Sequence, residues 1–390
     1  MIDLKLKNNS FVGRRHPWVF SGAFLSIPEG LQSGDLVRVL DRDGSFFASG
    51  YFNSYSQIAV RIWSYRDGER VNQAFFVKRL ANALAIRERF VEPSGTNAYR
   101  LINSESDFLP GLIVDRYGKY LSVQFHTRGI EIYKEQVIAA LREVCRPIGI
   151  YERSESNHRK RDDLEKSSGL LFGEVPDEVE ITENNFKFLV DIKEGQKTGF
   201  FLDQRDKRQA ISKYSKNASV VNLFSYSGGF SVYALAGGAR RVVSVDVSEK
   251  ALELAKKNVI LNGFDLDKCE FIKVDVKEYL KKINNNEFDI VILDPPAFIK
   301  DRHKKREGVR GYAKINEAAA SITDNGILIT CSCSTHLNLQ DFRYMAAEAV
   351  AAAGKNGQIL ETFIHGIDHL EALSFIESEY LKCLVLKISN

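Results

Sequence analysis

The stretch Ser219-Val-Val-Asn-Leu-Phe-Ser-Tyr-Ser-Gly-Gly-Phe230 decides the fold of the C-terminal half of the chain. Its first five residues are typical of a short buried strand, and a helix is predicted from Gly229 to Ala236. The glycines in the intervening turn let the backbone approach a ligand closely. The pattern is that of a strand, a ligand-facing turn and a helix, which is the first unit of a βα series.

Further βα units follow this stretch. We predict strands at residues 241–246, 270–273, 288–293 and 326–330, and helices at 248–262, from 277 onwards, near 312–322 and around 346–353. The strands are continuously apolar, which is typical of a parallel sheet covered by helices on both faces. We therefore expect a Rossmann-like α/β domain over residues 186–390.

Two smaller domains are expected before it, since 390 residues suit two or three domains. Residues 1–72 contain alternating strands at 36–40, 45–51 and 58–62 with turn residues between them, which favours a small β-barrel. Residues 73–185 open with a helical period up to Phe90 and continue as mixed strands and a helix over 131–144. They are expected to form a central α/β domain.

The composition is that of a globular protein, with 44% apolar and 27% charged residues. No apolar run approaches the ~18 residues of a membrane helix, and the first nine residues lack the apolar stretch of a secretory signal. Five cysteines, an odd number in so long a chain, do not suggest a disulfide framework. We expect a cytoplasmic protein that does not span a membrane.

Polar side chains follow three consecutive predicted strands, at the edge of a parallel sheet where ligands bind. Asp246 suits the two hydroxyls of a ribose, and Asp275 lies where an adenine amino group would be bound. Each acid alone is better explained as a helix cap or a solvated loop residue, but the ordered set favours a cofactor site. The turn after Asn222 lacks the three spaced glycines of a dinucleotide fold, which disfavours a nicotinamide-dependent oxidoreductase.

The next two strands carry the sharpest motifs. Asp294-Pro-Pro-Ala-Phe298 ends a strand, because prolines cannot donate to the ladder, and leaves the carboxylate over the cofactor region. Thr330-Cys-Ser-Cys-Ser-Thr-His336 follows the last predicted strand. Cys331 and Cys333 with His336 invite a zinc interpretation, but no second ligand pair has suitable spacing, so no metal is predicted. Inert core cysteines and a nucleophilic thiol at Cys333 remain open.

Two segments are candidate contacts for a nucleic acid. The segment Gly13–Phe20 groups cations beside a tryptophan, and the competing interpretation places Trp18 in the core. Between residues 300 and 314, seven lysines and arginines face two acids, a local +5 in a chain whose net charge is +3. This run directly follows the Asp294 motif, where the phosphates of a nucleic acid would pass. The predicted nucleic-acid contacts are Arg14, Arg15, Trp18, Lys300, Arg302, Lys304, Lys305 and Arg306.

At these residues the sequence resembles the class I S-adenosylmethionine-dependent methyltransferases. More narrowly, it resembles the bacterial family that methylates C5 of cytosine in large-subunit ribosomal RNA. The motifs are Gly195-Gln-Lys-Thr-Gly-Phe-Phe-Leu-Asp-Gln-Arg205, Asn222–Phe230 and Ser332-Cys-Ser334, with Gly111–Tyr117 in the central domain and Gly13–Phe20 with Gly34-Asp35 in a PUA domain. The likeness covers nearly the whole chain. Cys331, at a place that is usually apolar or aromatic, and Thr335-His336 depart from the family pattern.

The resemblance implies a PUA-like RNA-binding domain, a small central domain and a methyltransferase domain. It implies S-adenosylmethionine as cofactor, 23S-like ribosomal RNA as partner, and catalysis by Cys333 and Asp294. A thiolate at C6 would activate the cytosine ring, and the carboxylate would stabilise charge at its N3 edge. The base that removes the C5 proton is not assigned by the sequence, and His336 and Cys331 are the two candidates for it. The implied cofactor-binding residues are Thr198, Asn222, Phe224, Tyr226, Gly228, Asp246, Asp275, Asp294 and Pro295.

Two other functions stay open. An Asp-Pro-Pro motif followed directly by an aromatic residue also marks methyltransferases of base nitrogens, although Ala297 intervenes here. The chain could also be an RNA-binding assembly factor that has lost catalysis. The sequence leaves the target nucleotide undecided, and it leaves the oligomeric state open, with a homodimer as one option.

Overall fold

The computed structural model describes residues 1–10, 12–299 and 301–390, which form two compact units. The first unit comprises Met1–Ile181, Val190–Phe200 and Ile367–Ser378. The second comprises Thr182–Leu189, Phe201–Gly366 and Glu379–Asn390. The chain thus contributes short returning segments to each unit. The domain borders after residues 72 and 185 stay predictions.

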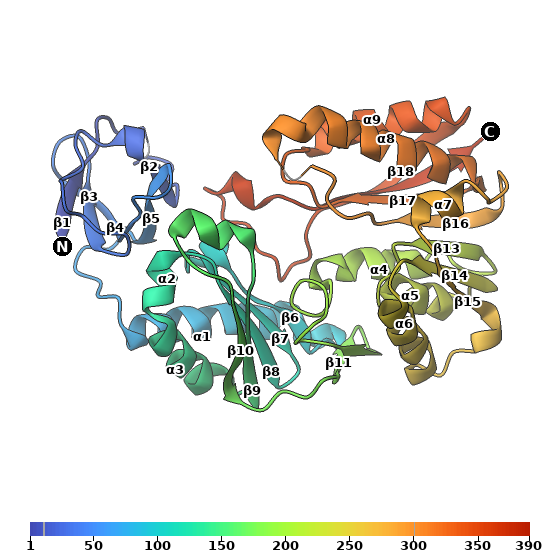
Figure 1. The fold of residues 1–390 in the computed structure, drawn as a ribbon, viewed down its shortest axis with the longest axis horizontal. Coiled ribbons are helices and arrows are strands. Elements are labelled where there is room, and N and C mark those ends of the chain that lie inside the picture. The colour runs from blue at the N-terminus through green and yellow to red at the C-terminus, as the bar shows by residue number, and fades with distance from the viewer. Residues whose placement is uncertain (11, 300) are drawn as a thin grey trace. The chain divides into compact units, whose positions relative to one another are not determined.

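The N-terminal part of the first unit is a five-stranded sheet in the order β1-β3-β4-β5-β2 (Figure 1). Its core is formed by the alternating residues expected from the sequence, among them Val37, Val39, Val60 and Ile62. The strands predicted at 36–40, 45–51 and 58–62 are present within a residue or two. The bounds are β1 Ile2–Lys5, β2 Trp18–Phe20, β3 Leu36–Leu40, β4 Phe46–Phe52 and β5 Ile58–Ser64.

A second five-stranded sheet of the first unit has the order β10-β9-β8-β7-β6. Helix α1 is capped by the Asn72 side chain, which accepts a hydrogen bond from the Phe75 amide, and it packs against α3. The helix expected over 131–144 is broken at Tyr133 into α2 and α3. The bounds are α1 Gln73–Phe90, α2 Arg128–Ile132, α3 Lys134–Cys145, β6 Ala98–Asn103, β7 Leu112–Tyr117, β8 Tyr120–Phe125, β9 Gly149–Ser154 and β10 Ser167–Gly173. A two-stranded sheet follows, β11 Val179–Glu183 with β12 Phe186–Val190.

The second unit contains a seven-stranded sheet in the order β15-β14-β13-β16-β17-β19-β18. Strands β13 to β17 are parallel, as predicted. Two strands that the sequence did not predict, β18 and β19, complete the sheet, and β19 is antiparallel to both β17 and β18. No helical crossover joins β18 to β19, so the chain returns in the opposite direction. The bounds are β13 Ser219–Leu223, β14 Arg241–Asp246, β15 Cys269–Lys273, β16 Phe288–Leu293, β17 Thr323–Ser332, β18 Asn356–Phe363 and β19 Lys382–Ser389.

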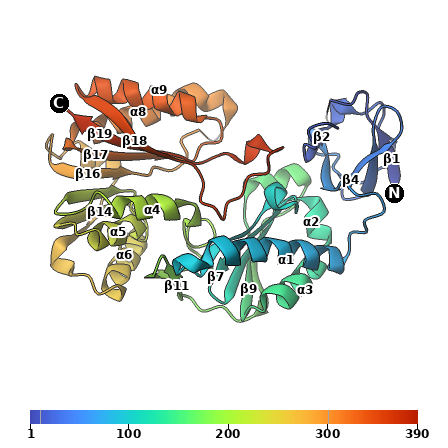
Figure 2. The same cartoon turned by 180° about the vertical axis from the view of Figure 1, so that it is seen from behind.

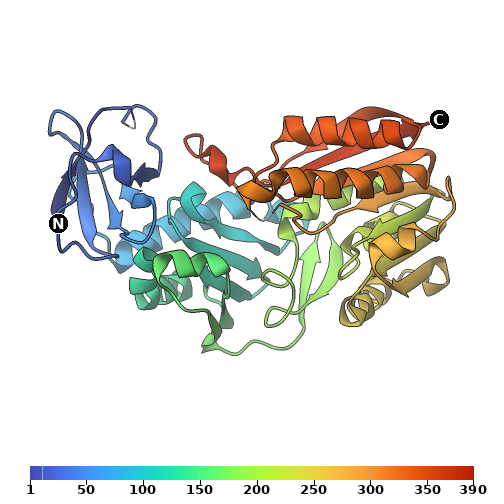
Figure 3. The ribbon, with the colours of Figure 1, turned by 45° about the horizontal axis from the view of Figure 1, so that its top comes forward.

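Helices cover both faces of this sheet (Figures 1 and 2). Helices α4, α5 and α6 pack on one face, while α7, α8 and α9 pack on the other, with α8 and α9 side by side (Figure 3). The apolar strands, including Val221, Val243 and Val291, form a core with Tyr312 and Phe342. The bounds are α4 Arg205–Ser212, α5 Gly229–Ala236, α6 Glu249–Leu261, α7 Val276–Leu280, α8 Lys305–Ser321 and α9 Leu339–Ala352. Across the described ranges, no helix has both the length and the hydropathy of a membrane span.

Candidate active site

The turn between β13 and α5 adopts a rare backbone. Phe224, Tyr226 and Gly228 all have positive φ angles, of 61°, 44° and 74°. A Cβ atom on Gly228 would lie 2.7 Å from the Cβ of Ala255, so helix α6 packs directly against the turn. The positive φ angles and the packing against α6 therefore fix the course of this turn at the end of β13.

Two buried polar atoms of this turn have no hydrogen-bond partner among the described residues. They are Oδ1 of Asn222, whose amide nitrogen donates to the Ser231 hydroxyl at 3.0 Å, and the hydroxyl of Ser225. A buried polar atom without a partner is costly, and in a binding site it is the group that a ligand satisfies. The β13 end thus offers both an acceptor and a hydroxyl to a bound molecule.

Asp246 connects the ends of β13 and β14. It is 7% exposed, and its two carboxylate oxygens accept hydrogen bonds from the backbone amides of Tyr226 at 3.0 Å and Ser248 at 2.9 Å. A carboxylate has about four acceptor sites, so this arrangement fixes the side chain and leaves capacity for further donors. The geometry suits an anionic acceptor held at the strand end.

Asp275 and Thr198 have structural partners. The Asp275 side chain is the N-cap of α7 and accepts a hydrogen bond from the amide of Lys277 at 2.8 Å. This is the helix-cap role that the sequence offered as the alternative to cofactor binding. The Thr198 hydroxyl donates to Asp115 at 2.5 Å and lies 2.9 Å from the Tyr117 hydroxyl, within the first unit. Cofactor binding by either residue stays a prediction.

Asp294 follows β16 and is half-buried, while Pro295 beside it is buried. Its Oδ2 accepts a hydrogen bond from the Gln204 side chain at 2.9 Å. Gln204 is itself 3% exposed, and it lies just before α4 on the opposite face of the sheet. The hydrogen bond from Gln204 therefore fixes the orientation of the Asp294 carboxylate from the side of the sheet that α4 covers.

Cys333 lies just beyond the end of β17 and is partly exposed. In the parallel register Leu293 lies opposite Thr330, so Asp294 and Cys333 leave neighbouring strands at the same edge. The next residue, Ser334, is buried, and its hydroxyl lies 2.9 Å from the Tyr312 hydroxyl and accepts from the Ile299 amide at 3.3 Å. The thiol is thus carried by a loop whose following residue is anchored.

Tyr312 joins this loop to the Asp294 motif. Its hydroxyl also accepts from the amide of Phe298 at 3.3 Å, and its ring packs against the Phe298 ring at 4.7 Å between centroids. Burial raises the pKa of Tyr312 above its ordinary value, so the phenol keeps its proton and can donate. One side chain of α8 therefore ties the Asp294 loop and the Cys333 loop together.

The neighbouring cysteine differs from Cys333. Cys331 is fully buried and lies opposite Cys383 on β19. A hydrogen bond with Cys383 and burial both raise the pKa of the Cys331 thiol well above its usual range. Strand β17 ends at Ser332, so Cys331 lies within the strand and Cys333 lies in the loop that follows it. A role for Cys331 as the proton acceptor is disfavoured, whereas His336 is exposed on the same loop.

The basic run after Asp294 is mostly helical. Helix α8 begins at Lys305, seven residues before the predicted start, since the charged segment lacks an apolar period that would reveal a helix. Lys304 and Arg306 are exposed, and Lys305 forms an ion pair with Asp341 at 2.7 Å. Lys300 and the side chain of Arg302 lie outside the described residues.

The N-terminal cluster is only partly exposed. Arg14 and Arg15 are exposed, and the guanidinium of Arg15 lies over the Tyr65 ring. The indole of Trp18 donates to Glu105 at 2.7 Å, and its ring meets the Phe375 ring edge-on at 4.7 Å. Trp18 is thus partly buried and contacts Glu105 and Phe375. Base stacking by Trp18 stays a prediction.

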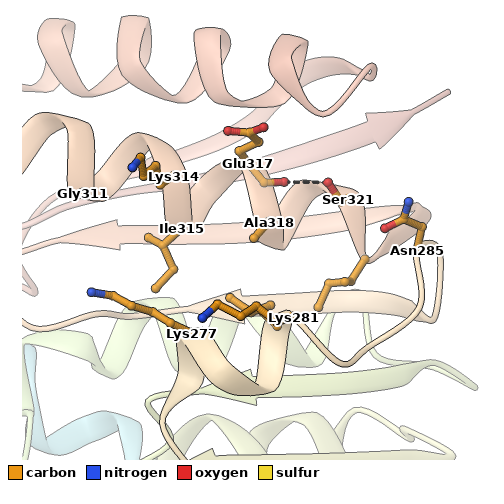
Figure 4. A pocket seen from close by; sticks show the side chains of 11 residues that line it. Lys277, Lys281, Asn285, Gly311, Lys314, Ile315, Glu317, Ala318 and Ser321 are labelled. Carbon is orange, nitrogen blue, oxygen red and sulfur yellow. Dashed lines mark hydrogen bonds between the residues drawn. The ribbon is translucent and has the colours of Figure 1, made fainter.

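A groove lies between α7 and α8 (Figure 4). Its accessible volume is about 560 Å³, and Leu280, Ile315 and Ile322 supply apolar lining. Figure 4 shows Lys277, Lys281 and Lys314 around it, with Glu317 farther along α8. Over the described ranges, no group of three or more His, Cys, Asp and Glu side chains is placed to hold a metal ion.

Sequence reasoning did not single out three residues that hold the site together. Gln204 lies inside a quoted motif, and Ser334 lies beside Cys333, but neither residue type signals its role. Tyr312 marked only the start of a predicted helix. Their importance comes from contacts across the sheet, which no spacing in the sequence reveals.

Known proteins share this arrangement. A family model described as S-adenosylmethionine-dependent methyltransferase matches residues 152–350, and a PUA-like domain model matches residues 2–65. The "Ribosomal RNA large subunit methyltransferase I" of Tolumonas auensis is 43% identical over 96% of both chains. The protein of the same name from Alteromonas mediterranea is 40% identical over 100% of this chain and 99% of its own.

Two solved structures share the fold over nearly the whole chain. The crystal structure of SMU.776 complexed with SAH has a TM-score of 0.85 at 24% identity and covers 99% of this chain and 100% of that chain. A second structure, of a protein from Streptococcus mutans, has a TM-score of 0.83 at the same identity and coverage. The matches confirm the predicted fold class, a Rossmann-like domain with a PUA-like β domain. The chain therefore belongs to the S-adenosylmethionine-dependent methyltransferases, in the family that includes the ribosomal RNA large subunit methyltransferases I.

Proposed function

We propose that this protein methylates C5 of a cytosine in large-subunit, 23S-like ribosomal RNA through a covalent adduct of Cys333. The observation that carries the proposal is the partly exposed Cys333 thiol on an anchored loop next to the Asp294 strand end. The relatives' name supports ribosomal RNA as the substrate class. The choice of carbon C5 follows the family resemblance of the sequence and is consistent with the chemistry of a thiol nucleophile.

The strand ends fit S-adenosylmethionine. Gly228, at a positive φ and packed against Ala255 of α6, fixes the turn whose backbone the cofactor would approach, and Asp246 retains acceptor sites for ribose hydroxyls. The unpartnered oxygens of Asn222 and Ser225 are available to the polar amino-acid end of the molecule. The backbone at Phe224 and Tyr226, the Asp275 loop and Pro295 complete the proposed lining. The bound cofactor supplies a methyl group activated on a sulfonium.

Cytosine C5 is a weak nucleophile, so the ring must first be activated. The Cys333 thiolate adds to C6, and the electron pair of the C5–C6 bond moves onto C5 and the N3 side of the ring. C5 then forms a bond to the methyl carbon as the carbon–sulfur bond of the donor breaks. A base removes the C5 proton, the C5–C6 double bond re-forms, and the thiolate leaves.

Two further groups have assigned roles. Asp294, oriented by Gln204, would hydrogen-bond the N3 edge or the exocyclic amine of the cytosine; when its carboxyl group carries a proton, it would donate that proton to N3 as negative charge develops there. His336 is the candidate for the base, because it is exposed on the Cys333 loop while Cys331 is buried. The target base must be single-stranded or turned out of a duplex to reach this edge.

RNA contacts are proposed on both parts of the chain. The first turn of α8, with Lys304, Lys305 and Arg306, begins a few residues after the Asp294 motif, and Arg14 and Arg15 are exposed on the PUA-like domain. Lys300, Arg302 and Trp18 are retained in the same role. A cytoplasmic location and the domain borders at residues 72 and 185 belong to this proposal.

The test is to map 5-methylcytosine in ribosomal RNA modified by the purified protein and by two cysteine variants. We expect Cys333→Ser to abolish C5 methylation while still binding S-adenosylhomocysteine, and the matched control Cys331→Ser to stay within about threefold of wild type. Full activity of Cys333→Ser, or a methyl group on a base nitrogen, would contradict the proposal. Binding of RNA without any binding of the cofactor would favour an assembly factor instead.

A further inference from the structure

A buried lysine lies directly behind the Cys333 loop. Lys382 is the first residue of β19 and is 1% exposed, and in the antiparallel register it lies opposite Ser332 of β17. Its Nζ donates to the backbone carbonyl of Ser334 at 2.8 Å and to that of Tyr380 at 2.9 Å. The ammonium group therefore holds the main chain one residue after Cys333.

The positive charge of Lys382 also interacts with the Cys333 thiol. Burial lowers the pKa of Lys382 to about 8, while the negative charges of Glu379 and of a Cys333 thiolate raise it. In most molecules the Lys382 side chain is therefore still protonated at neutral pH. A buried ammonium is costly unless it is compensated, and Lys382 has two neutral carbonyls and a neighbouring thiol that can ionise.

We propose that Lys382 is a positioning residue for the nucleophile, holding the Ser334 carbonyl and stabilising the Cys333 thiolate by its positive charge. This inference rests on the proposed role of Cys333. In this proposal a side chain of β19, the last strand along the chain, stabilises the ionised form of a thiol 49 residues earlier in the sequence.

Other groups act on the same thiol and its surroundings. Tyr312 of α8 faces Cys333, and Glu379 precedes β19. Asp294 and Lys207 act on the adjacent Cys331, with Lys207 on α4. Of the two lysines, Lys382 is the one that donates a hydrogen bond to the Cys333 loop, at the Ser334 carbonyl. Its removal should therefore change the pKa of the Cys333 thiol more than removal of Lys207 on α4.

The experiment measures the rate at which iodoacetamide alkylates Cys333 as a function of pH, in the full-length protein. Peptide mass spectrometry separates Cys333 from the other four cysteines. The variants are Lys382→Met, which removes charge and donor, and Lys382→Gln, which keeps a donor for the Ser334 carbonyl without the charge. The matched control is Lys355→Met, because Lys355 Nζ donates to the Thr323 carbonyl at the opposite end of β17 at 2.5 Å.

We expect the pH midpoint of Cys333 alkylation to rise by about one unit in both Lys382 variants, which means about tenfold less thiolate at neutral pH. Lys355→Met should leave the midpoint unchanged. An unchanged midpoint in Lys382→Gln would overturn the proposal, and this variant decides the case if Lys382→Met does not fold. Failure of the proposed function would show instead as C5 methylation by Cys333→Ser, which is a separate measurement.

The groove between α7 and α8 carries a second, independent inference. It begins at the Asp294 motif, because the Lys277 ammonium lies 5.7 Å from the centre of the Phe298 ring and Gly311 of α8 packs against the same ring. The groove is lined by Lys277, Lys281 and Lys314 and by one acid, Glu317. A positive groove with an apolar floor matches phosphates and base faces in turn.

We infer that this groove binds the backbone of the RNA strand that leads away from the target base. The inference rests on RNA being the substrate. The test compares Lys277→Glu/Lys281→Glu/Lys314→Glu with Lys216→Glu/Lys256→Glu/Lys268→Glu, a triple variant of equal charge on exposed lysines outside the groove. Fluorescence anisotropy would measure affinity for a ribosomal RNA fragment at several salt concentrations.

Three lost phosphate contacts should make the slope of log affinity against log salt shallower by about 2, using about 0.7 per contact for single strands. The control triple variant should change the slope by less than half as much. Equal slopes in the two triple variants would overturn the groove inference. Wild-type protein that does not bind the RNA at all would instead contradict the proposed function.

Discussion

Replacing Tyr312 with phenylalanine removes one oxygen atom from the point where the Asp294 and Cys333 loops meet. That oxygen lies 2.9 Å from the Ser334 hydroxyl and accepts from the Phe298 amide at 3.3 Å. Each buried hydrogen bond contributes about 1 kcal/mol net, so Tyr312→Phe should lower the free energy of unfolding by about 2 kcal/mol. With the tie removed, the thiol and the carboxylate lose their fixed separation. A displacement near 1 Å can cost about 100-fold in rate.

The assay is steady-state transfer of a labelled methyl group to ribosomal RNA, with urea unfolding and calorimetry of S-adenosylhomocysteine as companions. The control is Tyr233→Phe, because the Tyr233 hydroxyl also has buried partners: the Glu183 backbone carbonyl at 3.2 Å, the Glu183 side chain at 3.1 Å and the Asn184 side-chain amide, which donates to it at 2.9 Å. Tyr233→Phe should lose at least as much stability as Tyr312→Phe. Only Tyr312→Phe should lose about 10- to 100-fold in kcat with little change in cofactor affinity. Equal kcat in the two variants would refute the reasoning.

Three further changes have defined outcomes. Gln204→Leu removes the 2.9 Å hydrogen bond to Asp294 and should slow methyl transfer about tenfold, measured as kcat, whereas an unchanged kcat would show that the carboxylate needs no such support. Gly228→Ala places a methyl group against Ala255 at a positive φ and should abolish S-adenosylhomocysteine binding by calorimetry, and normal binding would contradict the close-approach role. The pKa of Lys382 is about 8 in the folded protein against an ordinary 10.5, so between these values the unfolded chain binds more protons and stability rises with pH. Between pH 8 and 9.5, the free energy of unfolding of the wild type should therefore rise relative to that of Lys382→Met. The rise is at most about 1.4 kcal/mol per pH unit. Urea titrations that give the same difference at both pH values would contradict this.

The central strands and the cofactor edge could be predicted from the sequence. Strands β13, β14, β16 and β17 contain short apolar runs that are buried, as in a parallel sheet covered on both faces, whereas β15, Cys269–Lys273, is a partly exposed edge strand. The polar residues that follow them, such as Asp246 and Asp294, then fall at one edge by topology alone. The family resemblance added the identities of the cofactor and the nucleophile.

The edge strands and the supporting contacts could not be predicted. Strand β18 is mostly exposed, so it lacks a buried pattern, and the direction of β19 depends on pairing rather than on its own sequence. Lys382 and Ser334 are 48 residues apart and meet only through that antiparallel pairing. The start of α8 was missed because its first turn is charged, and packing of Gly308 and Tyr312 decides that it is helical.

The covalent role of Cys333 is tested most directly with ribosomal RNA that contains 5-fluorocytosine. Fluorine at C5 cannot leave as a proton does, so an adduct between the thiol and C6 should persist after methyl transfer. The account predicts a protein–RNA complex that survives denaturing electrophoresis with the wild-type protein and with Cys331→Ser, and none with Cys333→Ser. A stable complex formed by Cys333→Ser, or none formed by an active wild-type protein, would contradict it.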